Sequence, residues 1–409
     1  MWIFYSLIFL FSVAIKHTAS IKCSLAQKCP SDVPCCSPYG ECGTGSTCLN
    51  RCNPMFSFQP YSCLPQPILL YPNSIQFPRR VKHIRSNANN INSIIRKKFG
   101  HSNKLSILAD NNFIHFEKFL ITTDSLLAKK QLEQYDFIYS GYTVPSDLDK
   151  VISLRMPPRT KGSLVSTSKL FLYGRCSVTL KAAKGRGVIT AIVLISQVGD
   201  EIDFEFLGTE SRNVQSNYYH LGHLDYTKMQ WLPITSDNTD AWHTYEIDWN
   251  KERIHWIIDG KIYRTVYRRE TWDPIKKKYL YPQTPVRLEV ALWPGGDINL
   301  PPGTAQWAGG FIDWDHDVEL KKKGFFESKV ANIIVSPYMN SHTSNIVKCI
   351  RYNTKRSRVK LADLQNVNFH YEPSINLDHT EIEKAVYWDC NKVFFLENQW
   401  SSKAKVSNY

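Results

Sequence analysis

Three acidic side chains recur at every second position of one short segment of this sequence. Glu201, Asp203 and Glu205 alternate there with three apolar residues. Because alternate residues of an extended strand point to opposite faces, the carboxylates would share one face while the apolar side chains dock in a core. Two carboxyl groups about 5 Å apart are the machinery of a retaining glycosidase: one attacks the anomeric carbon and the other protonates the leaving oxygen.

The spacing therefore predicts glycosidic-bond chemistry on this segment. Glu201 and Glu205 would lean toward each other, and Asp203 between them would hydrogen-bond the attacking carboxylate and hold its charge state. Two alternatives stay open, a solvated acidic edge strand and a calcium site.

The surrounding sequence has the texture of an antiparallel β-sandwich. From about residue 112 to about residue 335, short runs of β-branched and aromatic residues alternate with turn signals. Asp259-Gly260 separates two alternating runs, which favours a type I′ turn and predicts a hairpin over residues 254–264. Many short strands with few helical periods predict a mainly β fold. The expected strands are 177–182, 188–196, 201–207, 245–249, 254–258, 261–266, 286–293 and 330–336.

The predicted strand 286–293 offers a candidate wall for a substrate groove. Its alternation places Arg287, Glu289, Ala291 and Trp293 on one face. Trp293 could stack on a sugar ring and Glu289 could accept hydrogen bonds from hydroxyl or amide groups; core packing is the alternative for the tryptophan.

His220 and His223 form an H-x-x-H pair that could suggest a metal site. Two histidines without further ligands at metal-site spacing are better interpreted as part of a loop. We therefore expect neither a metal nor a cofactor.

The N-terminal region predicts export. Residues 2–15 are one apolar stretch, and small residues at 18–20 follow it, which indicates a signal peptide cleaved near Ser20. Eight of the 11 cysteines lie between Cys23 and Cys63, a framework of disulfides typical of an oxidising compartment. The cluster lacks histidine, which disfavours zinc. No later segment is long and apolar enough to predict a membrane span.

The chain is basic, with 50 Lys and Arg against 37 Asp and Glu, a formal charge of +13. In a cytosolic protein this excess would suggest nucleic acid. In a secreted one it favours attraction to acidic wall polymer, so we expect no nucleic-acid partner. Residues 64–110 combine Pro, Asn, Ser and basic residues, as a linker does. The predicted organisation is a signal peptide (1–20), a cysteine-rich module (21–63), a linker (64–111), a β-domain (112–335) and a C-terminal extension (336–409).

The acidic segment and several later motifs resemble the Crh branch of glycoside hydrolase family 16, over roughly residues 112–335. Phe204 stands where that family usually has a tryptophan. The matching runs are 200–205, 214–218, 242–249, 258–260, 292–296 and 303–310.

This resemblance implies a jelly-roll sandwich that transfers chitin chains onto β-glucan or another chitin chain. By the match, Glu201 is the nucleophile, Glu205 the acid/base that also contacts sugar, and Asp203 their assistant. Within the other matched motifs we expect substrate contacts from four residues, Asn217, Tyr218, Thr304 and Trp307.

The cysteine-rich segment resembles a hevein-type chitin-binding module, carbohydrate-binding module family 18, through the run from Cys35 to Cys48. Ser37 and Tyr39 of its binding set are kept, but Glu41 and Thr47 occupy aromatic positions, so a weak chitin binder and a purely structural module are both open. The disulfides that the resemblance implies are Cys23–Cys36, Cys29–Cys42, Cys35–Cys48 and Cys52–Cys63.

Three other functions compete with transfer: hydrolysis of β-glucan or chitin, sugar binding without catalysis on the same fold, and a structural role in the wall. The chain resembles the spore-wall (sporulation-specific) Crh members, which share the hevein-like module and lack an apolar C-terminal tail. We therefore expect a secreted, monomeric protein of the fungal cell wall that acts in ascospore wall assembly. Cys349 and Cys390 could pair and leave Cys176 without a partner.

Overall fold

The structure is a computed structural model, and the part of the chain that it describes is centred on the predicted β-domain. The described residues are 21–24, 26–37, 40–44, 48, 52–53, 56–58, 62–63, 69, 73–78, 120–122, 135–146, 148–197, 199–339, 370–371 and 386–387. The predicted signal peptide, Tyr39, Thr47, Cys349 and Cys390 lie outside this part. Among the described residues, no helix has the length and apolar character needed to cross a membrane.

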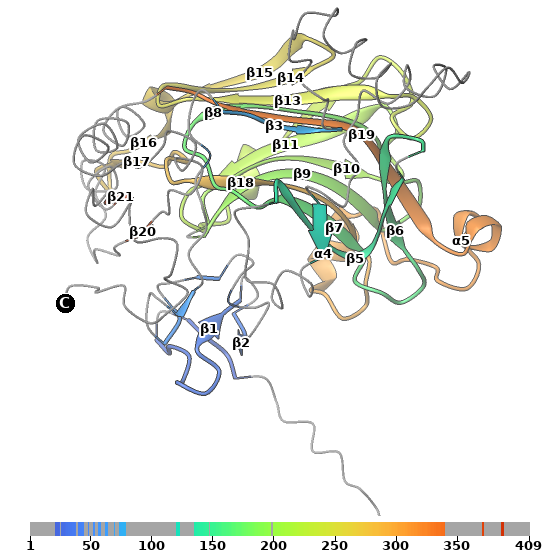
Figure 1. The fold of residues 1–409 in the computed structure, drawn as a ribbon. Coiled ribbons are helices and arrows are strands. Elements are labelled where there is room, and N and C mark those ends of the chain that lie inside the picture. The colour runs from blue at the N-terminus through green and yellow to red at the C-terminus, as the bar shows by residue number, and fades with distance from the viewer. Residues whose placement is uncertain are drawn as a thin grey trace, which may run out of the picture.

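The β-domain is one long antiparallel sheet that doubles back on itself as two leaves, in agreement with the predicted sandwich (Figure 1). Strand β5 (Phe137–Ser146) belongs to both leaves, and β4 (Leu120–Thr122) pairs with it in parallel. The first leaf continues, in spatial order, through β7 (Ser163–Thr167), β18 (Val286–Pro294), β9 (Val188–Ser196), β10 (Glu201–Leu207), β11 (Asn213–Tyr219) and β12 (Gln230–Pro233).

The second leaf runs from β5 in the other direction and covers the inner face of the first. Its strands, in spatial order, are β6 (Val151–Met156), β19 (Phe326–Pro337), β8 (Gly174–Lys181), β13 (His243–Trp249), β14 (Arg253–Ile258) and β15 (Lys261–Tyr267). Outside the leaves lie η4 (Tyr226–Lys228), η5 (Arg268–Thr271), β16 (Trp272–Asp273), β17 (Lys278–Tyr279), α4 (Pro302–Trp307) and α5 (Val318–Lys323).

Strand β5 changes leaves at a glycine. Residues up to Gly141 pair with β7, and residues from Tyr142 onward pair with β6. Gly141 has φ +69°, and a Cβ there would lie 2.1 Å from the carbonyl oxygen of Gly162. Only glycine adopts this conformation at so close a backbone approach without strain.

The core between the leaves is aromatic, which accounts for part of the aromatic excess of the sequence. Tyr245, Trp249 and Trp256 of the second leaf are fully buried. Phe204 and Phe206 of β10 meet the ring of Tyr245 edge-on, with centroids 5.6 and 4.6 Å away. Such edge-to-face pairs add to the free energy gained by burying apolar area. The core therefore fixes the inner face of β10.

The predicted hairpin is present as β14 and β15. Asp259 and Gly260 have φ of +49° and +80°, the positive values that a type I′ turn requires.

The predicted linker contains a strand of the β-domain. Residues 75–77 form β3 (Ile75–Phe77), which pairs with β19 and buries Ile75 and Phe77 in the core. Leu69 also joins this core and donates its amide to the carbonyl of Leu170. The β-domain therefore begins before residue 112, and the polar composition of the linker hid these apolar contacts.

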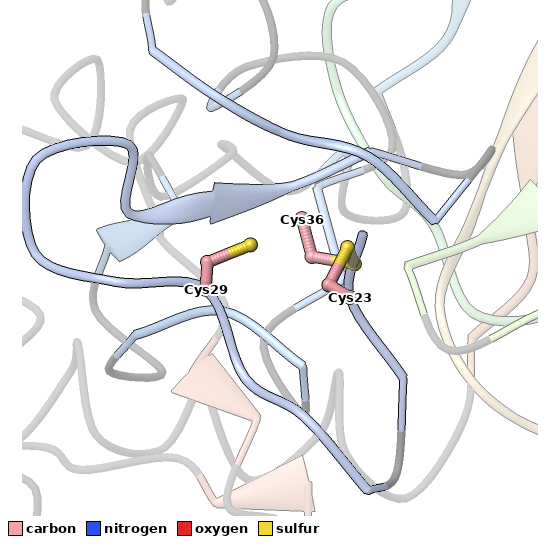
Figure 2. Close-up of side chains that lie close together, drawn as sticks. All are labelled: Cys23, Cys29 and Cys36. Carbon is pink, nitrogen blue, oxygen red and sulfur yellow. A yellow bond between two sulfur atoms is a disulfide. The ribbon is translucent and has the colours of Figure 1, made fainter. Parts of the chain in front are cut away.

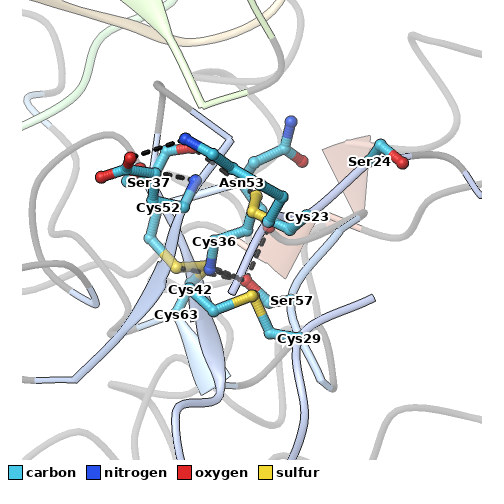
Figure 3. The surroundings of a disulfide bond; sticks show 12 residues. Cys23, Ser24, Cys29, Cys36, Ser37, Cys42, Cys52, Asn53, Ser57 and Cys63 are labelled. Atoms are coloured by element: carbon cyan, nitrogen blue, oxygen red, sulfur yellow. Dashed lines mark hydrogen bonds and ion pairs between the residues drawn. A yellow bond between two sulfur atoms is a disulfide. The ribbon is translucent and has the colours of Figure 1, made fainter. Parts of the chain in front are cut away.

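The cysteine-rich segment is held by the four predicted disulfides, Cys23–Cys36, Cys29–Cys42, Cys35–Cys48 and Cys52–Cys63. Its short strands β1 (Cys35–Cys36) and β2 (Cys42–Gly43) pair with each other. Buried Ser57 links the bridges: its hydroxyl accepts the amide of Cys36 and donates to the carbonyl of Asn53 (Figure 3). With so little apolar area to bury, covalent bridges supply the stability of a segment this small.

Candidate active site

Strand β10 presents its carboxylates on the outer face of the first leaf, away from the core. Ile202, Phe204 and Phe206 are fully buried between the leaves. The intervening Glu201 and Glu205 are partly exposed, and Asp203 is buried. The structure therefore separates acidic and apolar side chains on the two faces of one strand.

Strand register shows what lies beside each carboxylate. Rows of paired residues run across the leaf at right angles to the strands, about 5 Å from one strand to the next. The row of Glu201 contains Tyr219, Ile195 and Arg287; that of Asp203 contains Asn217, Val193 and Glu289; that of Glu205 contains Gln215, Ala191 and Ala291. Alanines occupy the row of Glu205 on β9 and β18, and Trp293 packs against the cluster that contains Ala191.

The carboxyl groups on β10 perturb one another. Burial, and then the charge of Glu201, raises the pKa of Asp203 well above the usual range of a carboxyl group. Burial, followed by the charges of Asp203 and Glu201, does the same to the pKa of Glu205. Oδ1 of Asp203 and Oε2 of Glu205 are buried and accept no hydrogen bond from the described residues. Polar atoms in that condition are common where a ligand completes the hydrogen bonding.

The backbone of the acidic strand is anchored from the second leaf. Trp256 of β14 donates its indole N–H to the carbonyl oxygen of Asp203 at 2.9 Å. Phe204, at the position where a tryptophan is usual, fills its place in the core by its contact with Tyr245. These contacts hold the centre of β10 while its outer face stays free for chemistry.

Asp200, directly before β10, is a further anchor that the sequence interpretation did not single out. Its fully buried carboxylate accepts the amides of Leu221, Gln283 and Thr284 and the hydroxyl of Thr284, all within 3.0 Å. Nδ1 of His220 lies 3.2 Å from Oδ1 of the same group.

These contacts connect β10 with the end of β11 and the approach to β18. Burial works to raise the pKa of Asp200, but the bonds from His220, Gln283 and Thr284 outweigh it and lower that pKa. The signal was in the sequence: by alternation Asp200 shares the apolar face, where a carboxylate needs several donors.

Glu289 of β18 forms a buried ion pair on the outer face. Nε of Arg287 lies 2.7 Å from Oε1 of Glu289, and each side chain is 3% exposed. Glu289 lies in the row of Asp203, two strands away, and Arg287 lies in the row of Glu201. The pair therefore keeps a charged, hydrogen-bonding wall beside the carboxylates of β10.

Trp293 and Trp307, both expected near the site, stack on each other with centroids 5.9 Å apart and planes 20° from parallel. The indole N–H of Trp307 donates to Oε1 of Gln215 at 2.8 Å. Trp307 and Thr304 belong to α4, and the stack packs on Ile189, Leu207 and Ala308. The structure thus brings α4, β18 and β11 together at the Glu205 end of β10.

Asn217 and Tyr218 face opposite sides of β11. Asn217 lies in the row of Asp203, and its amide donates to the hydroxyl of Tyr219 at 2.9 Å. The ring of Tyr218 is instead buried in the core near Trp256. Alternation along the strand is the reason, and it corrects the expectation that Tyr218 lines the groove: Tyr219 is the tyrosine on the outer face.

Among the described residues, one group of three potential metal ligands has its atoms within 4.8 Å of one another. These atoms belong to Cys23, Cys29 and Cys36 (Figure 2). Their sulfurs are part of two disulfides, Cys23–Cys36 and Cys29–Cys42. His220 is engaged with Asp200, and its backbone pairs with that of His223.

In the cysteine-rich segment, Ser37 accepts the amide of Glu41 through its hydroxyl at 3.1 Å. Glu41 itself forms an exposed ion pair with Lys22, with 2.7 Å between Nζ and Oε1. Charged side chains therefore occupy a position where the resemblance to chitin-binding modules would place an aromatic ring.

A two-leaved β-sandwich with paired glutamates flanking an aspartate on the outer face of one strand defines a glycoside hydrolase. The model of the glycosyl hydrolases family 16 matches residues 131–309. The chain is 43% identical over 406 residues to the "Probable glycosidase CRR1" of Saccharomyces cerevisiae, covering 96% of this chain and 94% of that protein.

It is also 36% identical over 318 residues to "Crh-like protein 2" of Aspergillus fumigatus, covering 78% of this chain and 62% of that protein. Among solved structures, "Apo Crh5 transglycosylase" aligns with 30% identity and a TM-score of 0.42, over 50% of this chain and 85% of that one. The chain belongs to glycoside hydrolase family 16, within its Crh-like fungal branch.

Proposed function

We propose that this protein is a retaining transglycosylase that cleaves chitin and joins the released chain to β-glucan or to another chitin chain. One observation carries the proposal. Glu201 and Glu205 flank Asp203 on the outer face of β10, and the pKa of Glu205 is raised, as a general acid requires. Membership of the Crh-like branch supports transfer as the outcome.

In the first step, the Glu201 carboxylate attacks the anomeric carbon and the glycosidic C–O bond breaks. The proton of Glu205 goes to the leaving oxygen, and the donor chain stays on Glu201 as an ester. Asp203, whose raised pKa favours its protonated form, donates a hydrogen bond to Glu201 and keeps that carboxylate oriented.

In the second step, a hydroxyl group of the acceptor attacks the same carbon. Glu205, now ionised, takes the hydroxyl proton, and the Glu201 ester bond breaks as the new glycosidic bond forms. Water in place of the acceptor gives hydrolysis, so the balance depends on how well the acceptor is held. Asn217, Glu289, Trp293, Thr304 and Trp307 are proposed to bind sugar around this centre.

A transfer assay tests the proposal. The protein is incubated with a chitin oligosaccharide donor and a panel of fluorescent β-glucan and chitin oligosaccharide acceptors. Wild type should give fluorescent products longer than the acceptor, and E201Q should lose at least 1,000-fold of that activity, because the nucleophile is gone. E210Q, at an exposed glutamate just after β10, should behave as wild type.

Unlabelled fragments without fluorescent products would make the protein a hydrolase. Binding of oligosaccharide without any cleavage would make it a lectin on this fold.

We also propose that the protein is secreted and acts in the wall of ascospores. The four disulfides support export, since such bridges form in oxidising compartments. The hevein-like segment is proposed to assist retention on chitin, with Ser37 and Tyr39 as its contacts. A fluorescent fusion should appear at the wall of sporulating cells, and its restriction to vegetative cells would contradict this location.

A further inference from the structure

The edge strand of the first leaf carries a tryptophan that the reaction described above does not use. Trp231 of β12 is 43% exposed, whereas its neighbour Leu232 is 3% exposed and packs in the core. Because successive residues of a strand face opposite sides, Trp231 points to the outer face of the leaf. An exposed indole there adds apolar surface beside the carboxylates.

Strand register aligns this indole with the proposed acid/base. Trp231 is paired with Gln215 of β11, and Gln215 is paired with Glu205 of β10. The backbones of β12 and β10 are two strand spacings apart, about 10 Å. Trp231 therefore lies in the same row as Glu205 and on the same face, with Gln215 between them.

A second aromatic surface lies on the opposite side of Glu205. Trp293 belongs to β18, which is two strands from β10 in the other direction, and it stacks with Trp307. Gln215, between Glu205 and Trp231, is held by its bond from Trp307. Trp293 lies in the row of Leu207, the next row on this face after that of Glu205. Aromatic side chains thus lie on both sides of β10, Trp231 on β12 and Trp293 on β18.

The groups beside Trp231 suit a neutral sugar. Gln215 and Asn217 present amide groups on β11, and the hydroxyl of Tyr219 lies 2.9 Å from the Asn217 amide nitrogen. A pyranose ring offers an apolar C–H face to a flat indole and hydroxyl groups around its rim to polar side chains. Stacking on an indole does not distinguish glucose from N-acetylglucosamine, because both present such a face.

We propose that Trp231 is the stacking platform of the acceptor site, where it holds a neutral β-linked chain for attack on the glycosyl-enzyme. The inference rests on the proposed transglycosylase function. It assigns one side of the outer face to the donor chain and the other to the acceptor. The donor chain lies toward Trp293 of β18, and the acceptor lies toward Trp231 of β12. Trp307, which stacks on Trp293 and bonds to Gln215, contacts both sides. The acceptor hydroxyl must lie next to Glu205, which takes its proton, and the row places Trp231 on that path.

The test compares W231A with wild type in an assay that separates donor from acceptor. The donor is a chitin oligosaccharide with a small chromogenic aryl leaving group, which does not reach across β11 and β12. The acceptor is a fluorescent oligosaccharide, either β-glucan or chitin. W231A should raise KM for both acceptors about tenfold, consistent with the usual contribution of one stacking contact. Its KM for the aryl donor should rise less than twofold, and its products should shift toward hydrolysis.

Two further variants serve as controls. W231F keeps an aromatic face and should recover most of the acceptor affinity. W242A removes a tryptophan of similar exposure, 41%, whose ring contacts Lys181 of β8 in the second leaf, and should leave both KM values unchanged.

An unchanged acceptor KM in W231A, or an equal rise in both KM values, would overturn the assignment of Trp231. Wild type that makes no transfer product at all would instead reject the proposed function, so the two failures are distinguishable.

Discussion

At the scale of single residues, the proposed chemistry depends on carboxyl groups in contrasting surroundings. Asp203 and Glu205 lie among few donors, and their pKa values are raised. Asp200, one residue before β10, accepts several hydrogen bonds, and its pKa is lowered. Nearby positions of one segment thus favour a protonated carboxyl group on the proposed reacting face and a charged one on the core side.

The anchoring role of Asp200 predicts a loss of stability on neutralisation. D200N places an amide nitrogen against donors and should lower the free energy of unfolding by about 3 kcal/mol, as when a buried charge loses its partners. Because the folded pKa of Asp200 is lowered, this contribution is present above the unfolded pKa of about 3.9 and is lost as pH falls through the folded value. The difference in unfolding free energy between wild type and D200N should therefore become smaller at acid pH.

Denaturant unfolding at pH 7 and at pH 3 measures this difference. D313N is the matched control, since Asp313 also accepts backbone amides and has a histidine Nδ1, that of His316, nearby at 3.1 Å, but is exposed. Its unfolding should follow that of wild type. A D200N protein as stable as wild type at pH 7 would show that the network around Asp200 does not anchor β10.

The raised pKa of Glu205 predicts that neutralising this residue stabilises the protein at pH 7, the opposite of the effect expected for Asp200. Above the ordinary pKa of glutamate, about 4.3, the unfolded chain gives up a proton that the folded protein retains, so wild-type stability falls as pH rises through the folded pKa. E205Q removes that penalty. Its Tm should exceed that of wild type at pH 7 and should match it more closely at pH 4. E210Q should show no such pH dependence, and an equal Tm shift of E205Q at both pH values would contradict the raised pKa.

At this scale, the alternation of side chains along a strand predicts from sequence which face most site residues occupy. It places Glu201, Asp203 and Glu205 on one face, and the same rule applied to β11 separates Asn217 from Tyr218. The contacts of Asp200 could not be predicted, because Gln283 and Thr284, which bind it, are more than 80 residues away in the sequence.

At the scale of elements, sequence predicts the features that depend on local turn preferences and misses those that depend on distant strands. The hairpin at Asp259-Gly260 follows from local preference alone, since both residues tolerate positive φ. Strand β3 depends on pairing with β19, which lies far along the chain, and a run of three residues in a polar region gives little periodicity. The change of leaf in β5 likewise requires a close approach to Gly162 that no local pattern reveals.

Alanine substitutions at two glycines with positive φ distinguish the cost of backbone strain from the cost of a steric clash. In G141A the new Cβ would meet the carbonyl oxygen of Gly162 at 2.1 Å, whereas at Gly260 nothing lies within 4 Å. G260A should cost about 1 kcal/mol, the price of the left-handed conformation. G141A should cost clearly more, because β5 must move where it joins the leaves. Equal unfolding free energies for the two variants would contradict the account of the leaf change.

At the scale of the whole molecule, the second leaf, the buried aromatic core and the anchors at Asp200 and Trp256 hold one strand so that its outer face can react. The fold class could be predicted from the short β-branched and aromatic runs between turn signals, and the family from its ordered motifs. The assignment of aromatic surfaces to donor and acceptor required strand register, because Trp231 and Trp293 are separated by four strand spacings in the sheet but by 62 positions in the sequence.

The covalent intermediate offers the most direct measurement of the central claim. E205Q is mixed with a chitin oligosaccharide that carries an activated aryl leaving group, so that the first step needs no acid and the second lacks its base. Mass spectrometry of the intact protein and its peptides should find one glycosyl group as an ester on Glu201. An adduct on another residue, or release of sugar with inverted anomeric configuration and no adduct, would contradict the claim that Glu201 and Glu205 act as nucleophile and acid/base.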